Sequence, residues 1–126
     1  MDDMSKSGDA DKAAIPMGVY VDIANMPWEP SRLPGSVQKT LYSDPASGRL
    51  TVLVKMEPGG VIPYHEHTEI EQTYVLEGSL EDDEGACTAG NFVWRPPGSR
   101  HEARCPNGAT FIVFFLKPVK RMPKPE

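Results

Sequence analysis

The sequence predicts an all-β domain, an antiparallel sandwich or small barrel of about eight to ten short strands. Stretches rich in β-branched and aromatic residues recur along the chain, separated by turns that contain Gly, Pro or Asp. No segment keeps a helical period for longer than two turns, and no internal repeat is visible. With 126 residues, the chain can build one hydrophobic core but not two.

The two ends differ in composition from the rest of the chain. Residues 1–16 are mostly small or charged and show no periodicity, which predicts a disordered N-terminal arm. Residues 17–126 form the predicted single domain, and its tail after Lys117 is basic and rich in proline. Within the domain, residues 19–23 alternate weakly and are expected to pair at a sheet edge.

A β-hairpin is predicted after a proline-rich stretch. Residues 26–35 contain three prolines and one glycine, which prevents regular ladder pairing over most of that span. Trp28, within it, is expected to cover the outside of the barrel or a subunit contact. Residues 37–42 and 50–56 then form the two strands, joined by the polar turn at 43–48.

Residues 61–67 and 71–77 are the next predicted strands, joined by a reversal at 68–70. The second of these carries Val75 on one face and Tyr74 on the other, so both faces are substantially apolar. We therefore expect a homodimer that buries the outer face of this sheet.

Three more segments complete the predicted sheet. The acidic run at 81–85 predicts a tight hairpin with its charges in water. Residues 91–95 form a short strand, and the rigid Pro-Pro-Gly loop at 96–100 presents His101 at the start of another. Residues 110–116, apolar at nearly every position, form the last strand.

All three histidines of the chain lie in this second half and predict a metal site. His65 and His67 are two residues apart on a predicted strand, so both imidazoles point to one face, roughly 6.5–7 Å apart at the backbone. A reversal could bring Glu71 beside them, and His101 could complete a site of three nitrogens and one oxygen. Because only a neutral imidazole binds metal, we expect release below about pH 6.

The glycines and prolines around these residues give the chain a resemblance to the cupin superfamily. Matches to the first cupin motif are Gly59, His65, His67, Glu71 and Gly78, and matches to the second are Gly90, Pro96, Gly98 and His101. The last position of the second motif holds Cys105 where the family has Asn. The resemblance implies a cupin double-stranded β-helix, a jelly-roll barrel.

Residues 28–116 are similar to the cupin of ChrR-type anti-sigma factors and to acetylacetone dioxygenase. In the anti-sigma relatives, the two His and the Glu of the first motif and the His of the second hold zinc, which implies His65, His67, Glu71 and His101 as ligands here. Acetylacetone dioxygenase uses iron with histidines alone, so the presence of Glu71 favours the four-ligand arrangement. The sequence lacks the helical zinc-binding domain of the anti-sigma factors, and we expect no direct anti-sigma role.

The function expected from these features is that of a metal-dependent dioxygenase acting on a small oxygenated compound of diketone or hydroxyketone type. Two alternatives stay open: a non-catalytic zinc- or ligand-binding sensor module, and a metal-dependent isomerase or lyase acting on a sugar-like substrate. The cofactor is one divalent transition metal, with Fe²⁺ or Zn²⁺ favoured over Ni²⁺ or Mn²⁺. Around it, Tyr64, Gln72 and Arg100 are candidates to orient a ligand or a substrate oxygen.

Composition limits the other partners. The net charge of -5 and the pI near 5.2 argue against nucleic acid. No apolar run is long enough to cross a membrane, and no signal peptide is recognisable, so we expect a cytoplasmic protein. In that reducing compartment Cys87 and Cys105 are expected to be free thiols.

Overall fold

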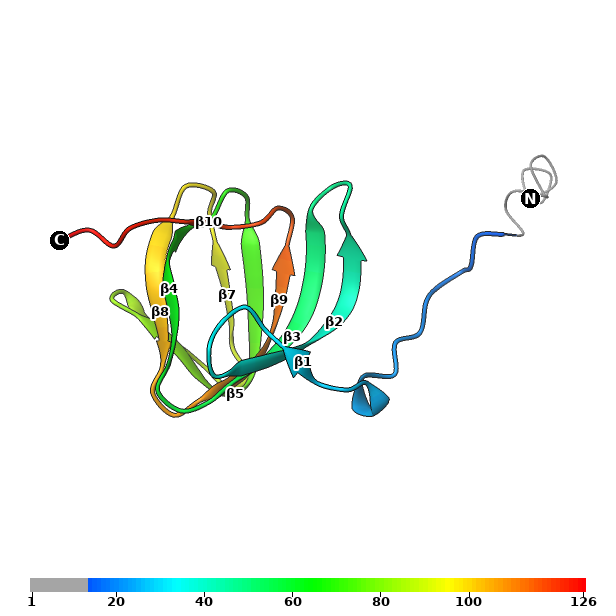
Figure 1. The fold of residues 1–126 in the computed structure, drawn as a ribbon, viewed down its shortest axis with the longest axis horizontal. Helices are drawn as coiled ribbons and strands as arrows, with labels where there is room; N and C mark the ends of the chain where they lie inside the picture. The colour runs from blue at the N-terminus through cyan, green and yellow to red at the C-terminus, as the bar shows by residue number, and fades with distance from the viewer. Residues whose placement is uncertain (1–13) are drawn as a thin grey trace.

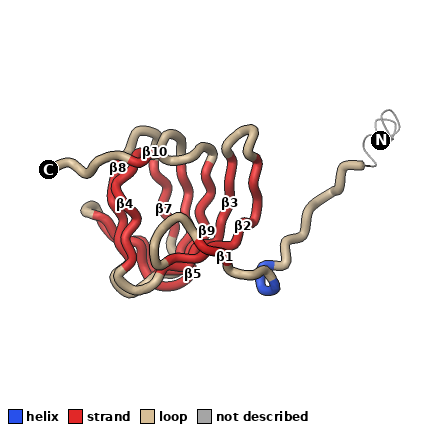
Figure 2. Tube along the Cα trace, in the orientation of Figure 1, coloured by secondary structure: helices blue, strands red, loops and turns tan. Residues whose placement is uncertain are grey.

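The computed structural model describes residues 14–126, whose regular secondary structure consists almost wholly of antiparallel strands, as Figure 2 shows. The predicted disordered arm, residues 1–16, lies mostly outside the described residues. The elements, in chain order, are η1 (Ile23–Asn25), β1 (Glu29–Pro30), β2 (Ser36–Asp44), β3 (Arg49–Met56), β4 (Gly60–Glu66), β5 (Glu71–Asp82), β6 (Gly85–Thr88), β7 (Phe92–Arg95), β8 (Arg100–Cys105), β9 (Ala109–Phe115) and β10 (Lys120–Arg121). Across the described range, no helix is long and apolar enough to span a membrane.

The strands form two layers that share β5 and curl around one core (Figure 1). Sheet A has the order β1-β2-β3-β9-β5-β7, and sheet B has the order β10-β4-β8-β5-β6. Residues 71–78 of β5 pair in sheet A, and residues 79–82 pair in sheet B. Every pairing is antiparallel, which confirms the predicted all-β jelly-roll architecture.

The passage of β5 from one sheet to the other depends on Gly78. This residue has a φ of +72°, and a Cβ added there would collide with the carbonyl of Gly108. A register shift between Val75 and Glu77 adds a bulge just before it. The sequence predicted that Gly78 would end the strand after Glu77. Instead Gly78 bends the strand, which continues to Asp82.

The predicted hairpin is confirmed as β2 and β3, paired from Ser36 opposite Met56 to Asp44 opposite Arg49. Its inward side chains join those of β5 and β9 in the core. The buried apolar members of this core are Val52, Val54, Met56, Val75, Leu80, Cys87, Cys105, Ala109, Phe111 and Val113. One apolar core thus fills the space between the sheets beneath the histidines.

The strand expected at residues 19–23 is wrong. Residues 19–22 pair with no strand among the described residues, and the chain enters the short helix η1 at Ile23. The Ile23 carbonyl accepts a hydrogen bond from Lys39 Nζ at 2.8 Å, and the same ammonium lies 4.6 Å from the Trp28 ring centroid. The chain at Ile23 and Trp28 therefore lies over the outside of β2 and β3, where Trp28 covers the barrel as expected, instead of joining the ladder.

Candidate metal centre

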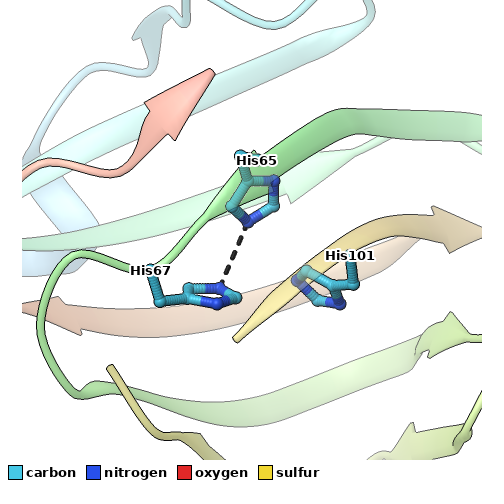
Figure 3. Close-up of side chains that lie close together, drawn as sticks. All are labelled: His65, His67 and His101. Carbon is cyan, nitrogen blue, oxygen red and sulfur yellow. Dashed lines mark hydrogen bonds between the residues drawn. The ribbon is translucent and has the colours of Figure 1, made fainter. Parts of the chain in front are cut away.

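The two sheet-B strands β4 and β8 bring the three histidines together. His65 lies directly opposite His101 across the antiparallel ladder, and His67 follows immediately after the end of β4. Figure 3 shows the three rings gathered together. Their centroids are 4.8 to 4.9 Å apart, and the ring planes are steeply inclined to one another. One ring nitrogen from each histidine lies within 4.8 Å of the other two. The juxtaposition predicted from the sequence is therefore present.

A β-bulge in β4 sets the direction of His65. Ile62 pairs with Ala103 and His65 pairs with His101, so β4 has one residue more than β8 between these two pairs. The carbonyl of Pro63, inside the bulge, accepts a hydrogen bond from His65 Nδ1 at 2.7 Å. The irregular backbone thus holds the ring of the residue that follows it.

Each imidazole donates its Nδ1 proton to a fixed oxygen. The acceptors are the Pro63 carbonyl for His65, the Ser99 carbonyl for His67 at 3.0 Å, and Asp82 Oδ2 for His101 at 2.9 Å. Carbonyl and carboxylate oxygens can only accept, so Nδ1 carries the proton on every ring and Nε2 keeps a lone pair. Three lone pairs are left available for a shared ligand.

The spacing of these lone pairs fits a metal ion. His65 Nε2 and His67 Nε2 are 3.2 Å apart, and with both Nδ1 atoms protonated neither can donate to the other. Two nitrogens bound to one ion at about 2.05 Å would be about 2.9 Å apart at a right angle and about 3.4 Å apart at the tetrahedral angle. A cation between them would replace lone-pair repulsion with two bonds, so the three-histidine cluster suits a transition metal.

Burial keeps the imidazoles neutral. The pKa of His67 is lowered to about 4, chiefly by desolvation and also by the neighbouring His65 and His101, against a hydrogen bond to Ser99 that raises it. Desolvation also lowers the pKa of His101 to about 4, although its bond to Asp82 acts in the opposite direction. The pKa of His65 is lowered by the same burial. At pH 7 the site is therefore ready to bind metal without first losing protons from its histidines.

Glu71 lies beside the cluster at the start of β5. Its Oε2 is 3.6 Å from His67 Nε2, but it is not among the ligand atoms that all lie within 4.8 Å of one another. Burial raises its pKa to about 7, against the opposing charge of Arg95. The assignment of Glu71 as a fourth ligand stays a prediction.

Asp82, at the end of β5, is a site residue that the sequence did not identify. Its Oδ2 accepts hydrogen bonds from His101 Nδ1 at 2.9 Å and from Arg95 Nη1 at 3.1 Å. Burial raises its pKa, but the bond from His101, the backbone N–H of Glu84 and the charge of Arg95 together hold the pKa below its usual range. Asp82 therefore stays ionised and orients one imidazole.

In the sequence Asp82 belongs to the acidic run at 81–85, which was predicted to be an exposed turn. Only Asp83 and Glu84 form the predicted exposed turn. If side chains alternated regularly from Glu71 onward, Asp82 would lie on the outer face of β5. The bulge after Val75 and the bend at Gly78 interrupt the alternation, so that Asp82 points inward. Strand periodicity alone therefore could not have found it.

The other predicted residues take different positions. Tyr64 lines the cavity in front of His67, and Arg100 lines it too while pairing with Glu66 at 2.9 Å. Gln72 is exposed, and its strand position lies opposite Trp94, so the structure does not bring it to the histidines. The two cysteines are free and buried, and Cys105 Sγ lies 3.7 Å from Met56 Sδ in the apolar core.

A cavity of about 770 Å³ opens onto His67 and His101. Val93 and Arg95 of β7 lie along its wall, and Lys124 of the C-terminal tail lies at its rim. The tail is held in place because β10 pairs with β4 and Lys124 forms an ion pair with Glu102 at 3.0 Å. The cavity has room for a small organic molecule beside the imidazoles.

Comparison with known proteins identifies the family. The sequence model of the ChrR cupin-like domain matches residues 16–120. The chain belongs to this family. No curated protein matches the sequence of this ChrR cupin-like protein significantly.

Solved structures share the fold at low sequence identity. A candidate acetylacetone dioxygenase from Methylibium petroleiphilum is 19% identical, with a TM-score of 0.78 over 86% of this chain and 83% of that one. The acetylacetone dioxygenase of Acinetobacter johnsonii is also 19% identical, with a TM-score of 0.71 over 86% and 79%. The polyketide cyclase RemF of Streptomyces resistomycificus is 23% identical, with a TM-score of 0.68 over 87% and 89%. These likenesses establish the cupin fold.

Proposed function

We propose that this protein is a metal-dependent dioxygenase that acts on a small diketone or hydroxyketone, with iron as the favoured metal. The observation that carries the proposal is the convergence of three Nε2 lone pairs, each fixed by a hydrogen bond at Nδ1, beside the cavity that His67 and His101 line. We propose His65, His67 and His101 as ligands, with Glu71 completing the set from the side of His67. A ferrous ion held there would supply the redox chemistry that dioxygen requires and open positions for two substrate oxygens.

The surrounding side chains suit an anionic oxygenated substrate. Arg95 lines the cavity and is only 17% exposed, so its positive charge acts at close range in a partly desolvated space. The enolate formed when a diketone loses a proton carries its negative charge on oxygen, and a guanidinium stabilises such an oxygen by charge-assisted hydrogen bonds. Val93 gives the same wall apolar surface for the carbon skeleton. These residues bind and orient the substrate.

Two observations support the diketone class. Two of the structural neighbours are, or are candidates for, acetylacetone dioxygenases, and acetylacetone is a small diketone. The cavity also places the cationic Arg95 beside the apolar Val93, which suits an enolate, although four carboxylates line the cavity as well: Asp82, Asp83, Glu84 and Glu102. Both observations are consistent with the oxygenase proposal.

Oxygen uptake by defined metal forms would test this function. The purified protein would be stripped with a chelator, reloaded separately with Fe²⁺, Zn²⁺ or Ni²⁺, and assayed for oxygen consumption with diketones and hydroxyketones. We expect uptake from the iron form only, dependent on substrate, and lost in His101→Ala while retained in Glu77→Gln, an exposed position outside the cavity. Absence of uptake with every compound would contradict the proposal.

A binding module is the second candidate, because the matching family is defined by the ChrR cupin-like domain. It would hold zinc tightly and change conformation or partner on ligand binding without turnover. Elemental analysis of protein purified without added metal separates the two: iron favours the oxygenase, and stoichiometric zinc with no oxygen uptake after iron loading favours the binding module.

A further inference from the structure

An apolar segment near the N-terminus is largely exposed in the described structure. Residues 14–21, which we call the apolar arm, contain no charged side chain. Met17 and Tyr20 are fully exposed, Val19 is 79% exposed, and no atom lies within 4 Å of the position a Cβ would take at Gly18. Figure 1 shows this segment running away from the sheets beyond the edge at β2. Such a segment gains nothing from folding unless another surface covers it.

The outer side of sheet A carries an uncovered aromatic surface. Its aromatic members, which we call the aromatic face, are Tyr74, Phe92, Trp94 and Phe114, exposed by 41 to 57%. They are neighbours across strands: Tyr74 is opposite Phe92, and Gln72 is flanked by Trp94 and Phe114. Half-exposed aromatic rings in this number present on the order of 400 Å² of apolar area, the size of patch that marks an interaction site.

The rest of the same sheet surface is already covered by the chain itself. Trp28 packs against Lys39 and Lys55, and the Ile23 carbonyl binds Lys39. As a result Leu53 of β3 is only 7% exposed on this outer side, whereas Phe114 on the next strand is 42% exposed. Ile23 and Trp28 thus cover the outer side of β2 and β3. The aromatic face lies beyond this cover and stays exposed.

We propose that the apolar arm of one copy lies on the aromatic face of a second copy, reciprocally, to form a two-fold symmetric dimer. Both surfaces are uncharged, both belong to every copy, and within a single chain the arm runs away from the face. One arm on one face buries roughly 800 Å², counting both surfaces, so two such contacts bury roughly 1,600 Å², the area of a stable dimer. In this arrangement the apolar arm of the partner copy covers the outer face of the sheet, which the sequence predicted to be buried in a homodimer.

Mixing two defective variants tests the exchange directly. One variant lacks residues 1–21, so it has a face and no arm; the other carries Phe92→Glu, so it has an arm and a disrupted face. Val61→Glu, at an exposed valine of sheet B, is the matched control for adding a carboxylate. Analytical ultracentrifugation measures mass over a wide range of concentration, and circular dichroism verifies that each variant is folded.

We expect a dimeric wild type and a dimeric Val61→Glu control, while each defective variant alone is monomeric or dissociates at least about 100-fold more readily. A mixture of the two should form a one-to-one heterodimer, because one intact arm can still meet one intact face. A monomeric wild type would mean that the arm folds on its own face and would overturn the proposal. A dimer that survives arm deletion, or a mixture that stays monomeric, would overturn it equally.

Discussion

Asp82 Oδ2 lies 2.9 Å from His101 Nδ1, so the last residue of β5 fixes a ring presented by β8. The bond determines which nitrogen of His101 is free, and the second bond from Arg95 holds the carboxylate in place. Each histidine of the cluster is oriented in this way by a different acceptor. At His101 the acceptor is a carboxylate side chain, which makes the orientation of this ring accessible to mutation.

Replacement of Asp82 by Asn should lower metal affinity by about 10- to 100-fold. The amide would no longer present a charged acceptor to His101, and the ring would lose its fixed tautomer. Competition against a chelating dye measures this affinity. Asp83→Asn is the matched control, because the adjacent carboxylate is 97% exposed and reaches only Arg104. Equal affinities for the two variants would show that Asp82 does not orient the ligand.

Replacement of Glu71 by Gln tests the four-ligand set. If the carboxylate binds the metal, it must first lose a proton held with a pKa of about 7, so affinity in the wild type should fall as the pH drops below 7. The variant should bind metal more weakly above pH 7 and lose this dependence. Glu77→Gln, at an exposed position on the same strand, is the control. An unchanged affinity and pH profile would leave the three histidines as the complete ligand set.

The metal-free protein should become less stable as the pH falls from 6.5 to 4. Burial lowers the pKa of His67 and of His101 from 6.5 to about 4, so in this range the unfolded state binds more protons and unfolding is favoured. Glu71 has the opposite effect: its pKa is raised from 4.5 to about 7, and its contribution to stability is lost as the pH rises through that range.

Urea unfolding of metal-free protein at several pH values measures the balance. We expect the two histidines to outweigh Glu71, and Glu71→Gln to steepen the loss of stability in acid. The same pKa values imply that protons compete with metal for the histidines only near pH 4, below the pH 6 expected from ordinary imidazoles. A free energy of unfolding that did not change between pH 6.5 and 4 would contradict this prediction.

Replacement of Cys105 by Asn, the residue that the second cupin motif has at this position, should destabilise the protein by about 1–3 kcal/mol. Cys105 is fully buried with its thiol against Met56, and burial together with Glu81 raises its pKa to about 11. No partner for an amide is visible among the described neighbours. Thermal or urea unfolding measures the change, with Cys105→Ala as a nonpolar control expected to lose less. An Asn variant as stable as wild type would refute this account of the substitution.

The sequence by itself determined the fold class, the hairpin at β2 and β3, and the three histidines. These follow from local physics: side chains alternate along a strand, glycines and prolines mark turns, and His65 and His67 share a face because they are two residues apart. The motif spacing also predicted that His101 would join His65 and His67, and the structure confirms this by pairing His65 with His101.

Only the tertiary structure decided the role of Asp82, the outward position of Gln72 and the path of residues 19–23. Asp82 turns inward because a bulge and the bend at Gly78 shift β5 from one sheet to the other. The alternation of side chains along the sequence does not reveal such a shift. Residues 19–23 have strand-like side chains, but contacts of Lys39 with the Ile23 carbonyl and with Trp28 hold the chain across the sheet instead of along a strand edge. Contacts between distant segments, which a local pattern does not contain, determine each of these features.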